Sequence, residues 1–308
     1  MPSERAPILI TGAHRSGTTW VGRLLAAAPR VSYISEPLNV LHRPGVFRAQ
    51  VPFWYTYICG DNGGAYLPSY QDLLSYRYHL GAELASLRSF RDLVRMGRDA
   101  SIFVRGRVGG CTPLLKDPFA VFSSVWFAET LHCRIVATVR HPAAFASGLK
   151  RLGWSFDFAD LLKQPLLMHD HLEPYKVAMQ STSSTDIIGQ AGVLWAAIYG
   201  TLQRLLAVVP TIQMVRHEDL AADPVPGFRR LYERLGLEYT SRAEQAILES
   251  SRPDNPTELS RERVHSVKMD SRASLQNWKR RLSTEEVARV RQLTDGVWQT
   301  YYPAGSWE

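Results

Sequence analysis

Residues Ile8–Trp20 read ILITGAHRSGTTW and join a short β-branched run to the first turns of an amphipathic segment. Gly12 and Gly17 have the G-x-x-x-x-G spacing of a phosphate-binding loop, in which backbone N–H groups surround an anion at a helix N-terminus. Nucleotide triphosphatases place a lysine directly after the second glycine, whereas this chain has Thr18 there and carries its cation inside the loop, as Arg15. The loop therefore keeps the anion cradle but predicts an anion other than a magnesium-bound triphosphate.

The overall composition is that of an ordinary globular protein, with 45% hydrophobic and 21% charged residues among 308. We expect no transmembrane segment, because no apolar run approaches roughly 20 residues, and the N-terminus lacks the apolar core of a signal peptide. The three cysteines have neither metal-ligand nor disulfide spacing, so we expect a cytoplasmic location and no metal. Acidic residues are interspersed with the basic ones that give the net charge of +7, and we expect no nucleic-acid partner. Peripheral membrane contact and the oligomeric state stay open.

Strand signals alternate with helix signals along the chain, without an internal repeat or a low-complexity linker. The expected elements are strands at 7–11, 31–34, 134–139 and 211–215, and helices at about 20–28, from Pro142, at about 190–208, at about 228–235 and from a capping box at Ser283 and Glu286. This order predicts a single α/β domain over 1–308, with a P-loop-type parallel β-sheet flanked by helices on both faces. Residues 41–110, rich in Tyr, Gly and Arg, are interpreted as an irregular insertion that covers the mouth of the sheet, where ligands of such sheets bind.

Five short motifs, beginning with the loop itself, follow one another along most of the chain. They are RSGTTW at 15–20, SEP at 35–37, VRHPAAFAS at 139–147, HEDL at 217–220, and the pair DSR at 270–272 and NWK at 277–279. In this order they resemble the family of sulfotransferases that use 3′-phosphoadenosine 5′-phosphosulfate (PAPS). The arginine that opens the loop and the Glu-Pro step are most similar to bacterial and Golgi-type carbohydrate sulfotransferases.

The resemblance implies that the loop binds the 5′-phosphosulfate of PAPS. The residues assigned to the donor in the loop are His14, Arg15, Ser16, Gly17, Thr18, Thr19 and Trp20. A transferring sulfuryl group carries less negative charge than a phosphoryl group, so hydrogen bonds and a cation can stabilise it without magnesium. In agreement, the strand at 134–139 ends in Arg140 and lacks the aspartate that would hold a metal.

The same resemblance assigns the 3′-phosphate of the donor to Arg140, Ser147 and Arg272. Family members usually place the serine eight residues after the arginine, where this chain has Gly148. The Ser147 hydroxyl and the Gly148 backbone are therefore both open as the contact. Arg272 belongs to a C-terminal segment that also contains Arg263, and a solvated charge run is the alternative interpretation of that segment.

Sulfuryl transfer to a hydroxyl needs a base that takes the proton as the oxygen attacks sulfur. Glu36 follows the second expected strand, and the resemblance makes it the base; capping of the following turn is the alternative. We also assign Arg15 and Lys116 to the catalytic set. Lys116 would stabilise the bridging oxygen or the sulfuryl group, and Asp117 would orient Lys116 or the acceptor; a surface ion pair is the alternative for Lys116 and Asp117. Pro118 stands where phenol and steroid sulfotransferases have their catalytic histidine, so that mechanism is not expected.

The acceptor is expected to be a small molecule or a glycan: a hydroxyl of a carbohydrate, a glycolipid or a glycosylated natural product, by analogy with the Glu-Pro step. Aromatic residues at 53–78, together with Trp154, Phe156 and Phe158, are candidates for stacking walls, although core packing is expected for half of them. Two other functions stay open from the residues alone. These are a P-loop kinase or nucleotidase using ATP, and a non-catalytic nucleotide-binding module.

Overall fold

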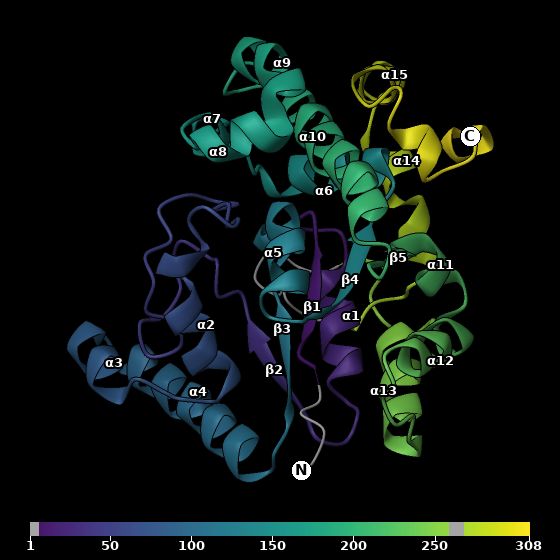
Figure 1. Cartoon of the computed structure of the whole chain (residues 1–308). Helices are drawn as coiled ribbons and strands as arrows, with labels where there is room; N and C mark the ends of the chain where they lie inside the picture. The colour runs from purple at the N-terminus through teal and green to yellow at the C-terminus, as the bar shows by residue number, and fades with distance from the viewer. Residues whose placement is uncertain (1–5, 259–267) are drawn as a thin grey trace.

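Five parallel strands form the centre of the computed structural model, which describes residues 6–258 and 268–308 (Figure 1). The strands are β1 (Ile8–Gly12), β2 (Val31–Ser35), β3 (Thr112–Lys116), β4 (Arg134–Val139) and β5 (Gln213–Arg216). Their order in the sheet is β2-β3-β1-β4-β5, so β1 lies in the middle, where the order along the chain reverses. Ligands of open parallel sheets bind at this place. The predicted α/β fold is confirmed.

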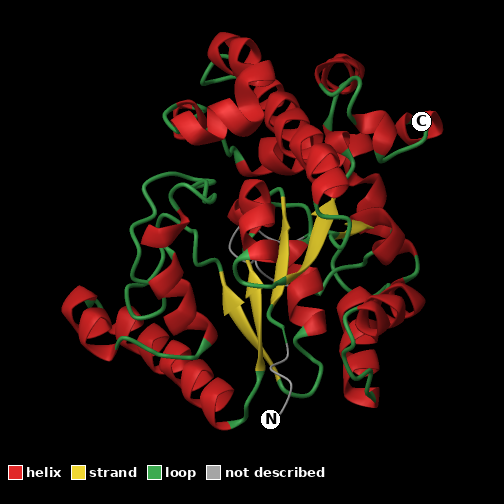
Figure 2. Cartoon of the chain, in the orientation of Figure 1, coloured by secondary structure: helices red, strands yellow, loops and turns green. Residues whose placement is uncertain are grey.

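Helices cover both faces of the sheet, as Figure 2 shows. Ile8 and Ile10 pack on one face with α1, α12 and α13, whereas Leu9 lies in the larger cluster on the other face with α5, α6 and α10. Both faces are apolar, as parallel strands require. The helices are α1 (Thr18–Leu25), α2 (Leu67–Leu74), α3 (Leu80–Ser86), α4 (Phe90–Val108), α5 (Ser124–Glu129), α6 (Pro142–Leu152), α7 (Ala159–Leu162), α8 (Pro165–Leu167), α9 (Lys176–Ser181), α10 (Ile187–Val208), α11 (His217–Ala222), α12 (Pro224–Arg234), α13 (Ser241–Ser251), α14 (Asn277–Arg281) and α15 (Thr284–Leu293).

Local sequence signals set several helix ends. Pro142 stands in the first turn of α6, where its missing N–H breaks no helical bond, and Gly153 ends that helix in the left-handed region at φ 66°. The capping box predicted at Ser283 and Glu286 is present at the start of α15. Helix α10 is the one helix of the described chain that is long and apolar enough to cross a membrane, and 72% of that stretch is buried inside the protein.

Two expectations about the region between β2 and β4 are wrong. Residues 41–110 are not irregular throughout, because they contain α2, α3 and the 19-residue α4. Helix α4 has apolar residues at helical spacing, among them Phe90, Val94, Val104 and Val108, but this row faces solvent. Strand β3 is absent from the expected elements because it contains Pro113, and proline is rare inside central strands.

The register of the parallel strands brings their last residues to one edge of the sheet. Ser35 of β2 pairs with Lys116 of β3, and Gly12 of β1 pairs with Thr138 of β4. Glu36, the residue after β2, donates its backbone N–H to the Lys116 carbonyl oxygen at 2.8 Å. Backbone pairing alone therefore sets Glu36 beside Lys116, at the edge where the loop after β1 begins.

Candidate active site

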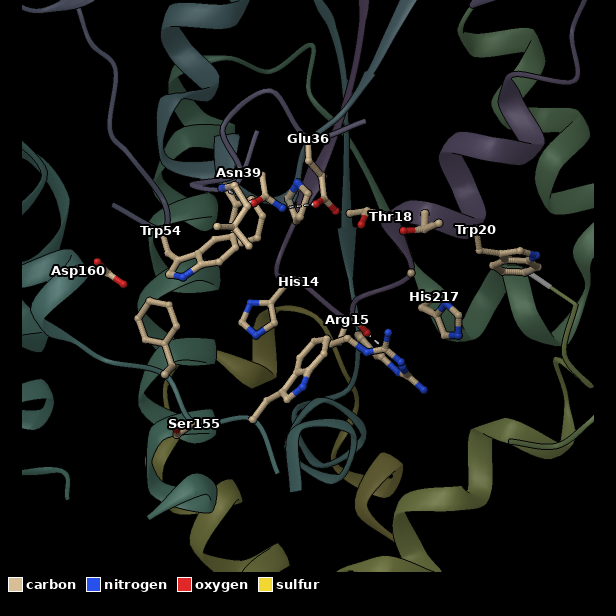
Figure 3. A pocket seen from close by; sticks show the side chains of 18 of the residues that line it. His14, Arg15, Thr18, Trp20, Glu36, Asn39, Trp54, Ser155, Asp160 and His217 are labelled. Atoms are coloured by element: carbon tan, nitrogen blue, oxygen red, sulfur yellow. Dashed lines mark hydrogen bonds between the residues drawn. The ribbon is translucent and has the colours of Figure 1, made fainter. Parts of the chain in front are cut away.

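A cavity of about 700 Å³ opens at the carboxyl edge of the sheet, which is within the range of small-molecule sites. Every strand contributes to its wall through the segment that follows it. These segments are the 14–20 loop after β1, Glu36 after β2, Pro118 after β3, Arg140 after β4 and His217 after β5. Figure 3 shows a loop end with Trp20 and His217, an aromatic end with Trp54 and Asp160, and Glu36 and His14 between them.

The loop after β1 has the backbone of an anion-binding turn. Gly12 and Gly17 have φ angles of 136° and 99°, and Arg15 itself lies in the left-handed region at 65°. A Cβ atom on Gly12 would collide with the Thr138 carbonyl oxygen, and one on Gly17 would lie 2.5 Å from His217 Nδ1. Gly17 is the N-cap of α1 and supplies no side-chain cap. The first N–H groups of α1 are therefore left for an anion.

Of the side chains in this loop, that of Ser16 holds the loop against β4, and the others lie in the cavity wall. Ser16 Oγ donates to the Ala13 carbonyl oxygen at 2.5 Å and lies 2.6 Å from Thr138 Oγ1. Its hydroxyl thus braces the loop against β4, and Ser16 does not line the cavity. The other loop residues predicted to bind the donor do line it: His14, Arg15, Gly17, Thr18, Thr19 and Trp20.

Two guanidinium groups face the cavity from neighbouring strands. Arg140 Nη1 donates to the Arg15 carbonyl oxygen at 3.1 Å, and both residues line the cavity. Burial, followed by the charge of Arg140, lowers the pKa of Arg15 to about 10, so this guanidinium stays charged near neutral pH. Burial also lowers the pKa of Arg140, and its Nε has no hydrogen-bond partner within 6–258 and 268–308. The two neighbouring guanidinium groups, together with the open Nε donor of Arg140, fit an anion that has more than one charged group.

His217 lines the loop end of the cavity but is absent from the predicted site. It is 6% exposed, and its ring meets Trp20 edge to face with 5.5 Å between centroids. Burial, with a smaller effect from the Arg140 charge, lowers its pKa to about 3. Neither ring nitrogen has a hydrogen-bond partner in the described part of the chain. A neutral imidazole of this kind can bind a polar ligand atom. Its sequence signals are its place directly after a strand and its position as the first residue of the HEDL motif at 217–220.

Glu36 presents its carboxylate to the cavity from a fixed position. Its Oε1 pairs with Lys116 Nζ, and its Oε2 accepts a bond from Asn39 Nδ2 at 2.7 Å. Lys116 is only 2% exposed, whereas Glu36 and Asn39 line the cavity. The alternative that Lys116 belongs to a surface ion pair is therefore wrong. Its buried ammonium holds the carboxylate in place.

Asp117 is buried behind this pair and organises two loops. Its Oδ2 accepts a bond from the Leu38 N–H at 2.6 Å, and its Oδ1 accepts one from the Phe119 N–H at 3.0 Å. Burial raises the pKa of this carboxyl to about 7, although both N–H donors act in the opposite direction. Asp117 therefore fixes the turn after Glu36 and the segment that brings Phe119 to the cavity.

His14 lies between the two ends of the cavity (Figure 3). Its backbone N–H donates to the Tyr55 hydroxyl at 3.2 Å, and its Nδ1 lies 2.8 Å from the same oxygen. Because His14 Nδ1 is the one acceptor that the Tyr55 hydroxyl meets in the described part of the chain, we assign the hydroxyl proton to this bond, which places the imidazole proton on Nε2. Burial, and then the charge of Arg15, lower the pKa of His14 to about 4. The ring is thus neutral near pH 7 and has one donor at Nε2.

The aromatic end combines ring faces with carboxylates. The Trp54 and Phe119 rings lie 4.6 Å apart between centroids, and Phe156 completes this wall. Asp157 and Asp160 line the same end, and burial raises the pKa of Asp160. Of the aromatic residues expected as stacking walls, Trp54, Trp154 and Phe156 line the cavity, whereas Tyr55, Tyr57, Tyr70, Tyr76 and Phe158 are buried in the core.

Arginine side chains give the wall of the described cavity positive charge. Cys59, Cys111 and Cys133 are free thiols. Among residues 6–258 and 268–308, no three His, Cys, Asp or Glu side chains form a set that could hold a metal ion. Arg15 and Arg140 bring two guanidinium groups to the cavity wall, and the Lys116 ammonium lies behind Glu36.

A family model described as the sulfotransferase family matches residues 7–241. The chain belongs to the sulfotransferase family. It is an enzyme of that class, and the family implies PAPS as the sulfate donor. No curated protein sequence gives a match.

Solved structures similar to this sulfotransferase include the following three. One is the sulfotransferase domain from the curacin biosynthetic pathway, at 15% identity over 97% of this chain and 98% of that chain, with a TM-score of 0.48. A second is STF9 from Mycobacterium avium, at 14% identity over 98% and 78% of the two chains and a TM-score of 0.47. A third is from Alicyclobacillus acidocaldarius, at 16% identity over 98% of both chains and a TM-score of 0.40.

Two residues that the family resemblance assigned to the 3′-phosphate do not line the cavity. Ser147 is buried on the side of α6 that faces α14, where its hydroxyl accepts a bond from Arg281 at 3.4 Å. Arg272 is exposed, and its Nε donates to a backbone carbonyl of α11 at 2.8 Å. Its neighbour Ser271 lines the cavity instead. Arg263 lies outside the described residues.

Proposed function

We propose that this sulfotransferase moves the sulfuryl group of PAPS to an acceptor hydroxyl, with Glu36 as the base. The observation that carries the proposal is the Glu36 carboxylate, which faces the cavity between its loop end and its aromatic end. Lys116 and Asn39 hold its two oxygens. A base in this position has an anion site on one side and room for an acceptor on the other.

The loop end has the groups that the donor requires. The first N–H groups of α1 and the hydroxyls of Thr18 and Thr19 would surround the 5′-phosphosulfate, and Arg15 adds a cation. Arg140 would take the 3′-phosphate, for which its open Nε is a donor. His217, with two open ring nitrogens, is assigned to the nucleoside part of the donor.

The reaction is an in-line displacement at sulfur. The acceptor oxygen forms a bond to sulfur as the bond from sulfur to the phosphate oxygen breaks, and Glu36 takes the acceptor proton. The products are a sulfate ester and adenosine 3′,5′-bisphosphate. Arg15 and the Nε2–H group of His14 stabilise the charge that develops on the sulfuryl and leaving oxygens, and Lys116, behind Glu36, holds the carboxylate that takes the proton.

The aromatic end supports a carbohydrate, a glycolipid or a glycosylated natural product as the acceptor. Trp54 and Phe156 offer apolar faces to a sugar ring, and the carboxylates of Asp157 and Asp160 can accept bonds from its hydroxyls. The cavity of about 700 Å³ has to hold the donor as well, so the rest of a larger glycan would extend into solvent. The free thiols agree with a cytoplasmic enzyme.

Calorimetric titration with adenosine 3′,5′-bisphosphate tests the donor site, with ADP and magnesium-ATP as the comparison ligands. We expect the bisphosphate to bind without magnesium and ADP to bind at least about tenfold more weakly, because ADP lacks the group that Arg140 would meet. Tight binding of magnesium-ATP with no response to the bisphosphate would support a kinase or nucleotidase instead.

Incubation with labelled PAPS and cell extract then identifies the acceptor by mass spectrometry, as the gain of one sulfuryl group. Binding of the bisphosphate with no transfer to a broad panel of sugars, glycolipids and glycosylated natural products would support the non-catalytic module.

A further inference from the structure

We propose that the outward face of α4 binds an anionic lipid surface. This helix exposes five large apolar side chains to solvent: Phe90 (79% exposed), Leu93 (45%), Val94 (59%), Val104 (61%) and Val108 (84%). Figure 1 shows α3 and α4 at the outer edge of the molecule, on the side away from α12 and α13. Single exposed apolar residues are ordinary, but a concentration of them on one element indicates a contact surface.

Four of these five residues, Phe90, Val94, Val104 and Val108, form a row because of helical spacing. Positions 90, 94, 97, 101, 104 and 108 are separated by alternating steps of four and three residues, so they share one side of the helix. The small residues Gly97 and Ser101 complete the row. The opposite side of α4 carries Phe103 and Gly106, which pack against Tyr76. One side of α4 is thus bound to the protein, and the other side is the apolar row.

Charge decides between the possible occupants of this row. Arg91, Arg98 and Arg105 are spaced by seven residues, so they run along one flank of it. Residues 88–108 contain six arginines and only two aspartates, and both aspartates are engaged in ion pairs. An apolar row with a basic flank complements acyl chains beneath anionic headgroups. A second copy of the helix would need an acidic row to meet these arginines, and α4, which is described along its whole length, has no such row.

The helix is fixed to the segment that borders the cavity. Arg43 pairs with Asp92 of α4 at 3.1 Å and with the fully buried Glu83 of α3. Leu41, two residues before Arg43, lines the cavity and is 80% exposed. A lipid surface bound to α4 would therefore be held at a set position relative to the cavity, where a lipid-borne acceptor could enter. This last step rests on the proposed function, whereas lipid binding itself does not.

Vesicle flotation of the full chain tests the lipid contact. The vesicles are phosphatidylcholine alone or phosphatidylcholine with about 30% phosphatidylserine, each at low and high salt. We expect the protein to float only with the anionic vesicles, and less at high salt. The paired change Phe90→Ser with Val94→Ser should lower the partition coefficient at least about tenfold, because it removes apolar area.

The triple change Arg91→Gln, Arg98→Gln and Arg105→Gln should also lower the partition coefficient at least about tenfold, since one basic residue near an anionic surface contributes about fivefold. A charge-matched control replaces three exposed arginines on the far side of the molecule with Gln, namely Arg230, Arg242 and Arg252. We expect this control to float like the wild type.

The proposal is overturned if the wild type does not float with anionic vesicles or if the control triple loses as much binding as the α4 triple. It is also overturned if the Phe90 and Val94 changes abolish dimer formation in sedimentation without affecting flotation, because α4 would then bind a second copy. Melting temperatures verify that each variant is folded. Titration of the wild type with adenosine 3′,5′-bisphosphate distinguishes failure of the two proposals. If the wild type does not bind the bisphosphate, the donor assignment is contradicted and the lipid contact is not affected.

Discussion

At the loop end of the cavity, the groups that face an anion are backbone N–H groups and two guanidinium groups, carried by the neighbouring strands β1 and β4. At the aromatic end, Trp54, Phe119 and the pair Phe156 and Asp160 come from three segments far apart in the chain. The loop end depends on glycines that no other residue can replace without a collision. At the aromatic end, single side chains can be substituted without a collision of the backbone, so the two ends of the cavity can diverge at different rates.

Glu36→Gln should have the largest effect, because this carboxylate serves both ends of the cavity. Glutamine keeps the size of the side chain but is a poor base, so we expect kcat to fall about 10²- to 10⁴-fold. Binding of adenosine 3′,5′-bisphosphate should stay within about twofold. Transfer assays and titration measure the two quantities. Full activity of the variant would exclude Glu36 as the base.

Asn39→Ala is the matched control for positioning, because it removes the hydrogen bond that Asn39 Nδ2 donates to the Glu36 carboxylate. We expect a loss of about tenfold in kcat, in line with the removal of one hydrogen bond to a charged group. A loss as large as that of Glu36→Gln would indicate that Asn39 meets the substrates directly.

Gly17→Ala should remove donor binding and leave the aromatic end unchanged. The new Cβ would lie 2.5 Å from His217 Nδ1, on a backbone at φ 99°, so we expect binding of adenosine 3′,5′-bisphosphate to weaken at least about 100-fold. Gly153→Ala is the matched control, because its backbone also has a positive φ, at 66°, and nothing lies within 4 Å of its new Cβ. Calorimetric titration compares the two variants, and equal affinities would contradict the close approach of the loop to His217.

Trp54→Leu should affect the aromatic end alone. Loss of the indole face that packs on Phe119 is expected to raise the KM for the acceptor about tenfold, because one aromatic stacking contact is worth about 1 kcal/mol or slightly more. The KM for the donor should not change. A rise in the donor KM instead would show that the two ends are not independent.

Acid should destabilise the protein modestly through the loop end. Burial lowers the pKa of His14 to about 4 and that of His217 to about 3, so below the ordinary value of 6.5 the unfolded chain binds protons that the folded chain does not. Their contribution to stability is complete above pH 6.5 and is lost as the pH falls toward 4. Asp117 acts in the opposite direction: because burial raises its pKa from 3.8 to about 7, its contribution decreases as the pH rises through that window.

Thermal melts at several pH values between neutral and about 5 measure this balance. We expect the wild-type melting temperature to fall with acid. His217→Phe should reduce the pH dependence of the free energy of unfolding by up to about 1 kcal/mol per pH unit. A slope that His217→Phe leaves unchanged would show that His217 is not the group that titrates.

The fold and the loop end could be predicted from the sequence because their signals are local. Gly12, Gly17 and the β-branched run before them lie within a few residues of one another, and Glu36 and Arg140 directly follow strands that are readable in the sequence. What could not be predicted depends on packing. Pro113 makes β3 unlike a central strand, and the local motif cannot tell that α6 turns Ser147 toward α14. Helix α4, in contrast, could have been predicted, because its apolar residues at 90, 94, 104 and 108 have helical spacing.

The pairing of Ser35 with Lys116 has a consequence for the chain between them. The 36–111 segment leaves β2 at its carboxyl end, beside Lys116, and returns to the start of β3, where Thr112 pairs with Val31, so it is a crossover excursion whose two ends are fixed at opposite ends of one parallel strand pair. Residues can be inserted or deleted within such an excursion at a modest entropic penalty that grows only with the logarithm of its length. Segments of different length from related enzymes could therefore be exchanged at this point, with Glu36 and Lys116 staying in register.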